Sequence, residues 1–355
     1  MLRRIWVKNF RNLSEQLLEL DPKFTVIRGE NNQGKTNLLE AIYFGISGGT
    51  IMDESLHDLP SFSSADSAVV GVDFESSTSH RLYREVSRRG AKFPVLDGES
   101  VRQARDQVPH GAAYWSADLI RSIQDSADER RKMVDRIVVK KDRKLEFLYK
   151  SYQRVLSQRN ACLRTGNRSL IRFYNDRFIE LSMAVTSARE RMVVELCDRV
   201  GPYISDILGD RLLTVSGVIQ MKGIDRLQDV DSFKHALEHR LEKDFALGFT
   251  SVGAHRDDIE FFIDGQSVVR YLSRGVNRIF ALLLNLSGLE SMVSKVPMIL
   301  LIDDAFCEVS SRLKDRVLPF LLGRFQIVYV STNTDEFRDF SGKRFIMELG
   351  VCTDG

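Results

Sequence analysis

The sequence predicts an α/β protein with β-rich and mixed α/β segments at both ends and an inserted α-helical lobe. Three observations support this class. A short apolar run, a glycine-containing loop and a helix-forming stretch follow one another near the N-terminus. A second apolar run near the C-terminus ends in two aspartates, and the middle of the chain has helical periodicity with little glycine. These changes of pattern indicate boundaries at 1–115, 116–245 and 246–355.

The N-terminal part contains short β-prone runs separated by polar stretches. We expect strands at IWVKNF (5–10), FTVIRG (24–29), AVVGVDFES (68–76) and HRLYREVSR (80–88). The Asp97-Gly98 pair predicts a turn after them.

From about Ser126 to Asp206 the pattern is that of long helices. Apolar residues such as Leu145, Leu148 and Tyr152 recur at helical spacing. Gly166 is the only glycine of this stretch before the Gly201-Pro202 pair, where we expect the helix to break. We interpret the stretch as a helical arm.

The C-terminal part returns to strands and helices in alternation. The expected elements are a strand pair turning at Asp264-Gly265, a helix over 275–293, the strand MILLI (298–302), a helix beginning near Ser310 and the strand FQIVYVST (325–332).

The composition is that of an ordinary globular protein. The chain has 355 residues, of which 43% are apolar and 28% charged. No apolar run approaches the length of a membrane span, and the N-terminus lacks the apolar core of a signal peptide. The four cysteines (Cys162, Cys197, Cys307, Cys352) lie far apart. We therefore expect a cytoplasmic protein with no membrane partner.

Positive charge is concentrated in the helical arm. From Arg130 to Arg177 there are 15 Lys or Arg against 4 Asp or Glu, which leaves 36 basic and 45 acidic residues elsewhere out of totals of 51 and 49. A basic block on an otherwise acidic chain indicates a polyanionic partner, with a solvated helix face as the alternative.

The segment GENNQGKT, Gly29 to Thr36, fits the P-loop pattern G-x-x-x-x-G-K-[ST]. Its backbone N–H groups and the following helix N-terminus would bind phosphate oxygens, Lys35 would reach the β- and γ-phosphates, and Thr36 would ligate Mg²⁺. The strand before it and the helix after it meet the structural context that this motif needs. We expect ATP to contact Gly29, Asn31, Asn32, Gln33, Gly34, Lys35, Thr36 and Asn37.

Asn32 stands where many such loops carry another glycine. Asparagine is among the non-glycine residues that best tolerate left-handed backbone geometry. We therefore expect a positive φ at Asn32 and a loop that still binds phosphate.

Two acids follow the apolar strand in PMILLIDDAFCE. Asp303 is placed to hold Mg²⁺, and Asp304 to position or deprotonate the attacking water. We expect Lys35, Asp303 and Asp304 to be the catalytic residues. The alternative is that the two aspartates only cap the next helix.

The segment YLSRGVNRIFALLLNLSGLE resembles the signature motif of ABC-type ATPases. In such proteins this segment caps the γ-phosphate of a nucleotide held by a second copy of the ATPase head. Ser273, Arg274 and Gly275 would then complete the site formed by Lys35 and Thr36 of a partner chain, so that ATP holds a two-fold dimer together.

The order of IWVKNFRNL, GENNQGKTNLLEAIY, SYQRVLSQRN, VGAHRDDIEFFIDG, YLSRG and ILLIDDAFCE is similar to that of the RecF family of bacterial recombination proteins. The resemblance covers nearly the whole chain and implies an ABC/SMC-type ATPase head, without a long coiled coil, that carries an inserted helical lobe. It also implies an ATP-dependent dimer that binds duplex DNA beside single-stranded gaps. With RecO- and RecR-like partners, such a protein would help load the recombinase in DNA repair, replication restart and the SOS response.

The sequence departs from the family pattern around the same site. Val276 and Asn277 replace two glutamines, Ser310 stands where the D-loop has aspartate, and STNTDEF (331–337) has no histidine switch. Gln124 is the candidate for a Q-loop glutamine. These departures favour tight ATP binding with slow turnover.

The resemblance also bears on the arm and on a polar cluster. The candidate DNA-binding residues are Lys140, Lys141, Arg143, Lys144, Arg154 and Arg159, which neutralise phosphates without reading sequence. Few aromatic residues interleave with them, so we expect duplex backbone contact rather than base stacking. For the cluster His255 to Asp258 we expect a structural turn rather than a metal site.

Three functions compete. The first is an ATP-switched DNA-binding repair protein whose weak, DNA-dependent ATPase activity resets it. The second is a non-hydrolysing ATP-binding scaffold that recruits repair partners, which the missing D-loop aspartate favours. The third, a GTPase or small-molecule kinase, is suggested by TNTD (332–335), but this lacks the lysine of a guanine-binding motif.

Overall fold

The computed structural model describes residues 1–51, 55–61, 67–75, 78–101, 110–117, 126–209, 212–221, 230–292, 297–306, 309–332, 337 and 340–355. The chain forms two compact units. Unit 1 consists of Met1–Leu119 and Val293–Gly355, and unit 2 of Ile120–Met292. Residues 246–292, which the sequence pattern groups with the C-terminal part of the ATPase head, thus belong to the same compact unit as the helical arm.

Unit 1 contains a mainly parallel sheet that carries the predicted phosphate loop. Its strand order is β16-β15-β3-β14-β13-β9, and only β16 pairs in the antiparallel direction. The strands are β3 (Phe24–Arg28), β9 (Gly111–Ser116), β13 (Met298–Asp303), β14 (Gln326–Ser331), β15 (Lys343–Glu348) and β16 (Val351–Asp354). The apolar runs at β3, β13 and β14 are almost wholly buried, as expected for central strands of a parallel sheet.

A second, antiparallel sheet completes unit 1. Its order is β2-β1-β4-β5-β7-β8, with β6 paired to β5. The strands are β1 (Leu2–Lys8), β2 (Gln16–Glu19), β4 (Ser67–Glu75), β5 (Ser79–Ser87), β6 (Gly90–Ala91), β7 (Val95–Leu96) and β8 (Glu99–Ser100). The predicted turn at Asp97-Gly98 is confirmed, with φ of 50° and 90°.

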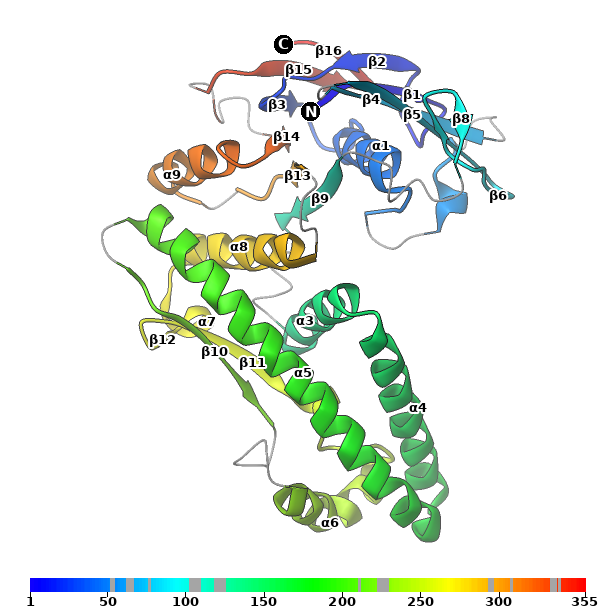
Figure 1. Cartoon of the computed structure of the whole chain (residues 1–355), viewed down its shortest axis with the longest axis vertical. Helices are drawn as coiled ribbons and strands as arrows, with labels where there is room; N and C mark the ends of the chain where they lie inside the picture. The colour runs from blue at the N-terminus through cyan, green and yellow to red at the C-terminus, as the bar shows by residue number, and fades with distance from the viewer. Residues whose placement is uncertain are drawn as a thin grey trace. The chain divides into compact units, whose positions relative to one another are not determined.

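Helix α1 (Lys35–Ser47) packs against strands of both sheets (Figure 1). Its apolar residues share one core with β4 and with β13 and β14; Leu38, Leu39 and Ile42 are fully buried there. Gly45 allows this close approach, because a Cβ atom at that position would lie 2.8 Å from a methyl group of Val72. Within the described part of unit 1, the other helical elements are η1 (Leu56–Asp58) and α9 (Ser311–Leu322).

Three helices form the arm of unit 2: α3 (Ala127–Lys141), α4 (Lys144–Thr165) and α5 (Arg168–Leu208). Gly166, with φ 71°, ends α4 in the left-handed conformation, and the Asn167 side chain caps α5. The predicted break at Gly201-Pro202 is wrong, because α5 continues through Pro202 to Leu208. Burial of Val200, Ile204 and Ile207 on both sides of the proline offsets the lost backbone hydrogen bond.

The described residues of unit 2 also form a small sheet and four further helical elements. The sheet is antiparallel with the order β10 (Val215–Gln220), β11 (Asp258–Ile263), β12 (Gln266–Ser267), and its hairpin turns at Asp264-Gly265 as predicted. The other elements are α6 (Val230–Leu247), η3 (Ala254–Arg256), α7 (Val268–Tyr271) and α8 (Arg274–Met292).

Of the helices that the structure describes, none combines the length and the apolar character that crossing a membrane requires.

Candidate nucleotide-binding site

The loop between β3 and α1 has the backbone geometry of a phosphate-binding loop. Asn32 has φ 63° and Gly34 has φ 107°, so the expected left-handed conformation of Asn32 is confirmed. At Gly29, a Cβ atom would lie 2.4 Å from the carbonyl oxygen of Met347 in β15, and only glycine fits this close approach. The close packing at Gly29 and the left-handed backbone angles of Asn32 and Gly34 thus fix the conformation of the loop.

Lys35 is the first residue of α1 and is buried in the loop. Its Nζ donates hydrogen bonds to the carbonyl oxygens of Gly29 at 2.8 Å and Glu30 at 2.7 Å. Burial lowers the pKa of Lys35, and the nearby carboxylates of Asp304 and Asp303 partly oppose this effect. The ammonium group has carbonyl partners in the loop but no carboxylate in direct contact, so an anion in the loop would stabilise its charge.

Asp303, the last residue of β13, lies against the loop. The Thr36 hydroxyl donates to its Oδ2 at 2.6 Å, and the Tyr114 hydroxyl donates to the same oxygen at 3.1 Å. Burial raises the pKa of Asp303, while these two hydrogen bonds act in the opposite direction. The structure therefore brings together the two residues that the sequence assigns to Mg²⁺.

The donor set fits a magnesium ion. A hydroxyl and a carboxylate are hard oxygen ligands, and Mg²⁺ prefers such oxygens with one or two protein ligands and the rest from water and phosphate. Thr36 and Asp303 are the residues that would hold the ion.

Asp304 lies one residue further on, at the edge of the site. Its backbone has φ 47°, its N–H donates to Val330 O at 3.1 Å, and its Oδ1 accepts a hydrogen bond from Thr332 N at 3.2 Å. These contacts fix Asp304 to the end of β14. It does not cap α9, which begins at Ser311 with Ser310 as its N-cap residue.

These residues line a pocket of about 630 Å³ in unit 1. The lining consists of Asn12, Asn31, Asn32, Gly34, Lys35, Thr36, Asn37, Asp303 and Asp304. Gly29 and Gln33 are not among them. Gln33 instead binds the turn between β15 and β16, since its Oε1 accepts from Leu349 N at 2.6 Å and its carbonyl oxygen from Gly350 N at 2.9 Å.

Sequence reasoning missed two residues of the site. Asn12, just after β1, accepts a hydrogen bond from Asn37 at 2.7 Å. Tyr114 in β9 pairs with Leu301 in the parallel register, two residues before Asp303, so both side chains leave the sheet on the same face. The aromatic residues Tyr114 and Trp115 are the signal for β9, and Asn12 lies in the segment IWVKNFRNL, from which no single residue was chosen.

The signature segment lies in unit 2. Ser273 precedes α8, where its Oγ accepts a hydrogen bond from Val276 N at 3.4 Å and its carbonyl oxygen from Asn277 N at 2.9 Å. Ser273 and Arg274 are exposed, and Gly275 is partly buried. Their contact with a nucleotide held by a second chain stays a prediction.

Arg159 cannot contact DNA, and its assignment to the DNA-binding set is wrong. The side chain is fully buried, because Arg159 lies on the same face of α4 as Tyr152, Leu156 and Leu163. It donates to Thr250 Oγ1 at 2.6 Å and to Asn175 Oδ1 at 3.1 Å, and it forms an ion pair with Asp244 at 3.4 Å. Arg159 therefore joins α4, α5 and α6 inside unit 2.

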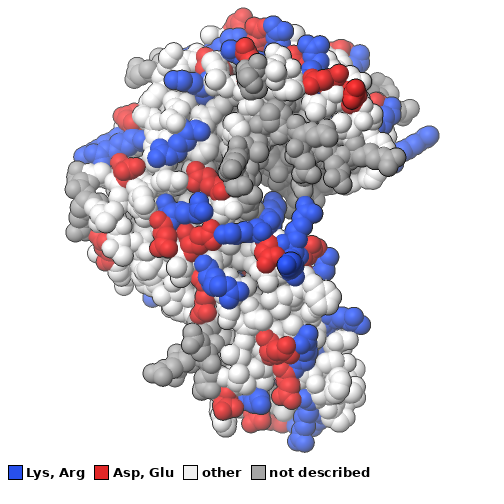
Figure 2. Space-filling view, in the orientation of Figure 1, with Lys and Arg blue, Asp and Glu red and all other residues white. Residues whose placement is uncertain are grey.

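The other candidate DNA-binding residues are exposed on α3, α4 and the turn between them. Lys141 forms an ion pair with Glu195 of α5, and the remaining four are Lys140, Arg143, Lys144 and Arg154. Figure 2 shows Lys and Arg side chains along the edge of unit 2 where α4 runs in Figure 1, with acidic side chains between some of them. Their role in DNA binding stays a prediction.

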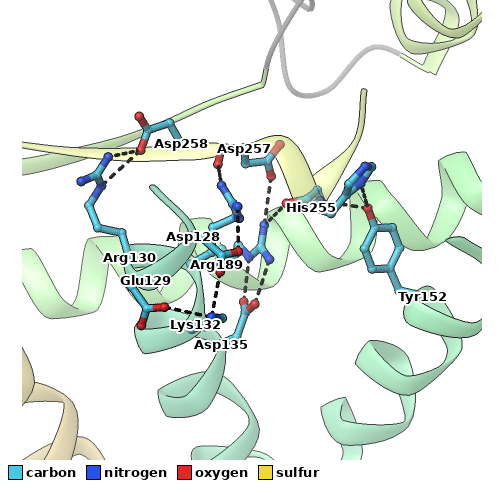
Figure 3. Close-up of polar contacts among 12 residues, drawn as sticks. Asp128, Glu129, Arg130, Lys132, Asp135, Tyr152, Arg189, His255, Asp257 and Asp258 are labelled. Carbon is cyan, nitrogen blue, oxygen red and sulfur yellow. Dashed lines mark hydrogen bonds and ion pairs between the residues drawn. The ribbon is translucent and has the colours of Figure 1, made fainter. Parts of the chain in front are cut away.

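The polar cluster around Arg189 lies where α3, α5 and the start of β11 meet (Figure 3). Arg189 makes two hydrogen bonds to Asp135, at 2.7 and 2.8 Å, one to Ala254 O at 2.5 Å and one to Asp257 at 3.2 Å. Asp257 also accepts from Thr186 Oγ1 at 2.8 Å. Burial raises the pKa of Asp257 to about 6, against the effect of Arg189.

His255, at the edge of this cluster, has both ring nitrogens engaged. Nδ1 lies 2.8 Å from the Tyr152 hydroxyl, and Nε2 lies 2.8 Å from Thr250 O. Burial lowers the pKa of His255 to about 4, so the ring is neutral; since a carbonyl oxygen can only accept, Nε2 carries the proton. No group of His, Cys, Asp and Glu suited to a metal occurs among the described residues. The contacts agree with the expected structural role of His255 to Asp258.

Several predicted features lie outside the described residues. They are the candidate Q-loop residue Gln124, the D-loop residues Cys307 and Glu308, and residues 333–336 after β14.

The phosphate loop, the acidic strand beside it and the two sheets around α1 define an ATPase head of the ABC/SMC type. Residues 1–159 match the family model described as AAA ATPase domain. A solved structure of an SMC head bound to the C-winged helix domain of ScpA has a TM-score of 0.55 and 15% identity, covering 100% of this chain and 97% of that chain. This second likeness concerns the fold alone.

Closer similarity is found to RecF proteins. The DNA replication and repair protein RecF of Anaeromyxobacter dehalogenans (strain 2CP-C) is 32% identical over 334 residues, which are 91% of this chain and 88% of the relative. A solved structure of the recombination mediator protein RecF-ATPrS in the RecFOR pathway is 25% identical with a TM-score of 0.72, covering 100% of this chain and 98% of that chain. The chain belongs to the RecF family.

Proposed function

We propose that this chain is an ATP-dependent DNA-binding protein of recombinational repair. It binds duplex DNA beside single-stranded gaps and, with RecO- and RecR-like partners, helps to load the recombinase. Its RecF relatives are DNA replication and repair proteins, and a solved RecF structure belongs to the RecFOR pathway, which supports this proposal.

The observation that carries the proposal is the 2.6 Å hydrogen bond between Thr36 and Asp303. It joins the phosphate loop to the acidic strand end, so the parts needed to bind ATP with Mg²⁺ lie together in unit 1. When bound there, Mg²⁺ would neutralise charge on the phosphates. Lys35 would exchange its carbonyl partners for phosphate oxygens.

In this proposal Asp304 activates the water that hydrolyses ATP. Its Oδ1 accepts a hydrogen bond from Thr332 N, which holds the carboxylate at the pocket edge. The other carboxylate oxygen would orient the attacking water and take its proton. The ATP-bound dimer would be completed by Ser273 to Gly275 of a second copy, and hydrolysis would release it.

A non-hydrolysing scaffold is the second candidate. Ser310, in the position of the D-loop aspartate, is the N-cap residue of α9, and its carbonyl oxygen accepts hydrogen bonds from Leu313 N and Lys314 N. It supplies no carboxylate. This favours slow turnover or none.

Steady-state ATP turnover, measured with and without gapped DNA, separates the two candidates. ATP turnover by the wild type should be slow and should be stimulated by gapped DNA. In Asp304→Ala, turnover should be absent both with and without DNA. Equal rates for wild type and Asp304→Ala would exclude hydrolysis at this site and leave the scaffold.

The dimer is tested by measuring molecular mass in solution with ATP, ADP or no nucleotide. We expect a dimer only with ATP, and its loss in Lys35→Met and in Ser273→Arg. Ser273→Arg should still bind ATP as a monomer with wild-type affinity, whereas Lys35→Met should bind ATP about 10- to 100-fold more weakly. A dimer that is insensitive to nucleotide and to both substitutions would exclude the composite site.

A further inference from the structure

Helix α4 presents an exposed stripe in which cationic side chains flank an aromatic ring. We name Arg143, Phe147, Lys150 and Arg154 the α4 stripe. Their spacings of four, three and four residues place them within about 60° of arc on one side of a helix with 3.6 residues per turn. Arg143 immediately precedes α4 and has helical backbone angles, with φ −60° and ψ −21°.

The stripe faces away from the core of unit 2. The buried residues of α4, Tyr152, Leu156, Arg159 and Leu163, lie on the opposite side of the helix. The stripe therefore belongs to the outer surface of the arm, and its composition is not required by packing within unit 2.

Phe147 is the feature of the stripe that packing leaves unexplained. It is 75% exposed, although single exposed apolar residues are common and carry no meaning alone. What distinguishes Phe147 is its position among cations. Lys150 forms an ion pair with Glu146 at 2.6 Å, but Arg143, Lys144 and Arg154 have no ion pair within the described part of the chain.

Unpaired cations around an exposed aromatic ring match the chemistry of single-stranded nucleic acid. Such binding combines phosphate contacts from Lys and Arg with stacking of bases on aromatic side chains. A base inside a duplex already has a neighbour on both faces, so only an unpaired base offers a free face to Phe147. Arg and Phe are also enriched in protein interfaces, so loss of a protein partner is one outcome of the test below.

We propose that the α4 stripe binds the single-stranded side of a gap, with Phe147 stacked on an unpaired base and Arg143 and Arg154 bound to phosphates. This rests on the proposed function and adds a group that distinguishes gapped from continuous DNA. It revises the expectation of duplex contact alone. From Arg143 to Arg154 the helix rises about 16 Å, so the two arginines can contact different phosphates of one strand.

The test compares binding of the full chain, with ATP and Mg²⁺, to two DNAs by fluorescence anisotropy. One is a duplex with a short single-stranded gap, and the other is a dumbbell duplex of equal length whose ends are closed by non-nucleotide linkers, so that it has no free ends and no unpaired bases. The variants are Phe147→Ala, Phe147→Trp and Arg154→Ala. The matched controls are Phe173→Ala, which removes a phenylalanine that is also 75% exposed, and Arg172→Ala, both on α5.

We expect Phe147→Ala to weaken binding to gapped DNA by about 5- to 100-fold and to leave binding to the dumbbell nearly unchanged. Phe147→Trp should bind gapped DNA like wild type, because it keeps a stacking surface. Arg154→Ala should weaken binding to both DNAs and lower the slope of log affinity against log salt by about 1.

Four outcomes would overturn the proposal. Unchanged gapped-DNA binding in Phe147→Ala, or an equal loss of binding in Phe173→Ala, excludes the stacking role of Phe147. In either case the proposed function still holds, because the wild type binds gapped DNA. Unchanged DNA binding combined with loss of a RecR-like partner would make the stripe a protein-binding surface. If wild type itself binds neither DNA, the proposed function fails together with this inference.

Discussion

Two clusters of charged residues, one in each unit, contain similar side chains but have different roles. In the Arg189 cluster every charge faces another: Arg189 contacts Asp135 and Asp257, and Arg130 contacts Asp258. In the nucleotide site Lys35 binds only backbone carbonyl groups, and Thr36 and Asp303 line a pocket. Charges satisfied from within the chain hold the chain together, whereas charges that line a pocket without an opposite partner in contact are suited to a ligand.

The largest effect that this comparison predicts is on stability, in Arg189→Ala. Removing the buried guanidinium leaves the carboxylate of Asp257 without a cation in contact, so the free energy of unfolding should fall by about 3–5 kcal/mol. Arg199→Ala on the same helix removes a more exposed ion pair with Glu195 and should change stability little. Urea unfolding of both variants measures the difference. An equal, small loss in both would show that burial does not separate the two clusters.

Lys35→Met should strongly weaken ATP binding and hardly change stability, the reverse of the effects expected for Arg189→Ala. We expect ATP affinity to fall about 10- to 100-fold, from the ~1.5–3 kcal/mol that a hydrogen bond to a charged group contributes. Stability without nucleotide should hardly change, because burial already disfavours the Lys35 charge. Isothermal titration calorimetry and thermal unfolding, with the exposed Lys23→Met as control, measure both quantities. Strong destabilisation would place Lys35 among the structural charges.

Asp303→Asn should weaken Mg²⁺-dependent ATP binding and stabilise the nucleotide-free protein. Burial raises the pKa of Asp303 above its ordinary value of 3.8, so the folded chain binds this proton more tightly than the unfolded chain. The ionised carboxyl therefore costs stability, and this cost is absent below pH 3.8 and complete above the raised pKa. At neutral pH the variant should therefore melt at a higher temperature than wild type.

The gain for Asp303→Asn should shrink as the pH falls through the raised pKa. Melting curves from neutral to acid pH, with the exposed Asp315→Asn of α9 as control, test the sign. A gain that grows on acidification would contradict the assigned direction of the pKa shift.

The smallest effect concerns Asn32. Its φ of 63° suits glycine and asparagine, so Asn32→Gly should bind ATP like wild type, while Asn32→Ala should lose about 1 kcal/mol of stability. Differential scanning calorimetry and ATP titration of this pair separate backbone geometry from side-chain chemistry. If Gly and Ala behave alike, the left-handed conformation is not what selects asparagine.

The sequence predicted those parts of the site that local patterns encode. The loop before α1, the acids after β13 and the left-handed Asn32 follow from spacing and backbone preference within a few residues. Tyr114 could not be found in this way, because its contact with Asp303 depends on the pairing of β9 with β13, which are far apart in the chain.

Two predictions from the sequence, for Arg159 and for Pro202, were wrong although neighbouring residues pointed to the correct answer. Arg159 follows Tyr152 and Leu156 at spacings that place it on the buried face of α4, yet its charge suggested exposure. Pro202 suggested a helix end, but packing of Val200, Ile204 and Ile207 keeps α5 continuous. In both places tertiary contacts overruled the usual preference of one residue.

The strand order of unit 1 also sets when the nucleotide site can form during synthesis. β3 lies between β14 and β15, Gly29 packs against Met347, and Gln33 binds Leu349 and Gly350. At about 5–20 residues per second, the phosphate loop leaves the ribosome roughly 15–60 s before these strands do. Unit 2 is continuous in the chain and is synthesised entirely within that interval. Competence to bind ATP is thus acquired last, by molecules whose translation has reached the final strands.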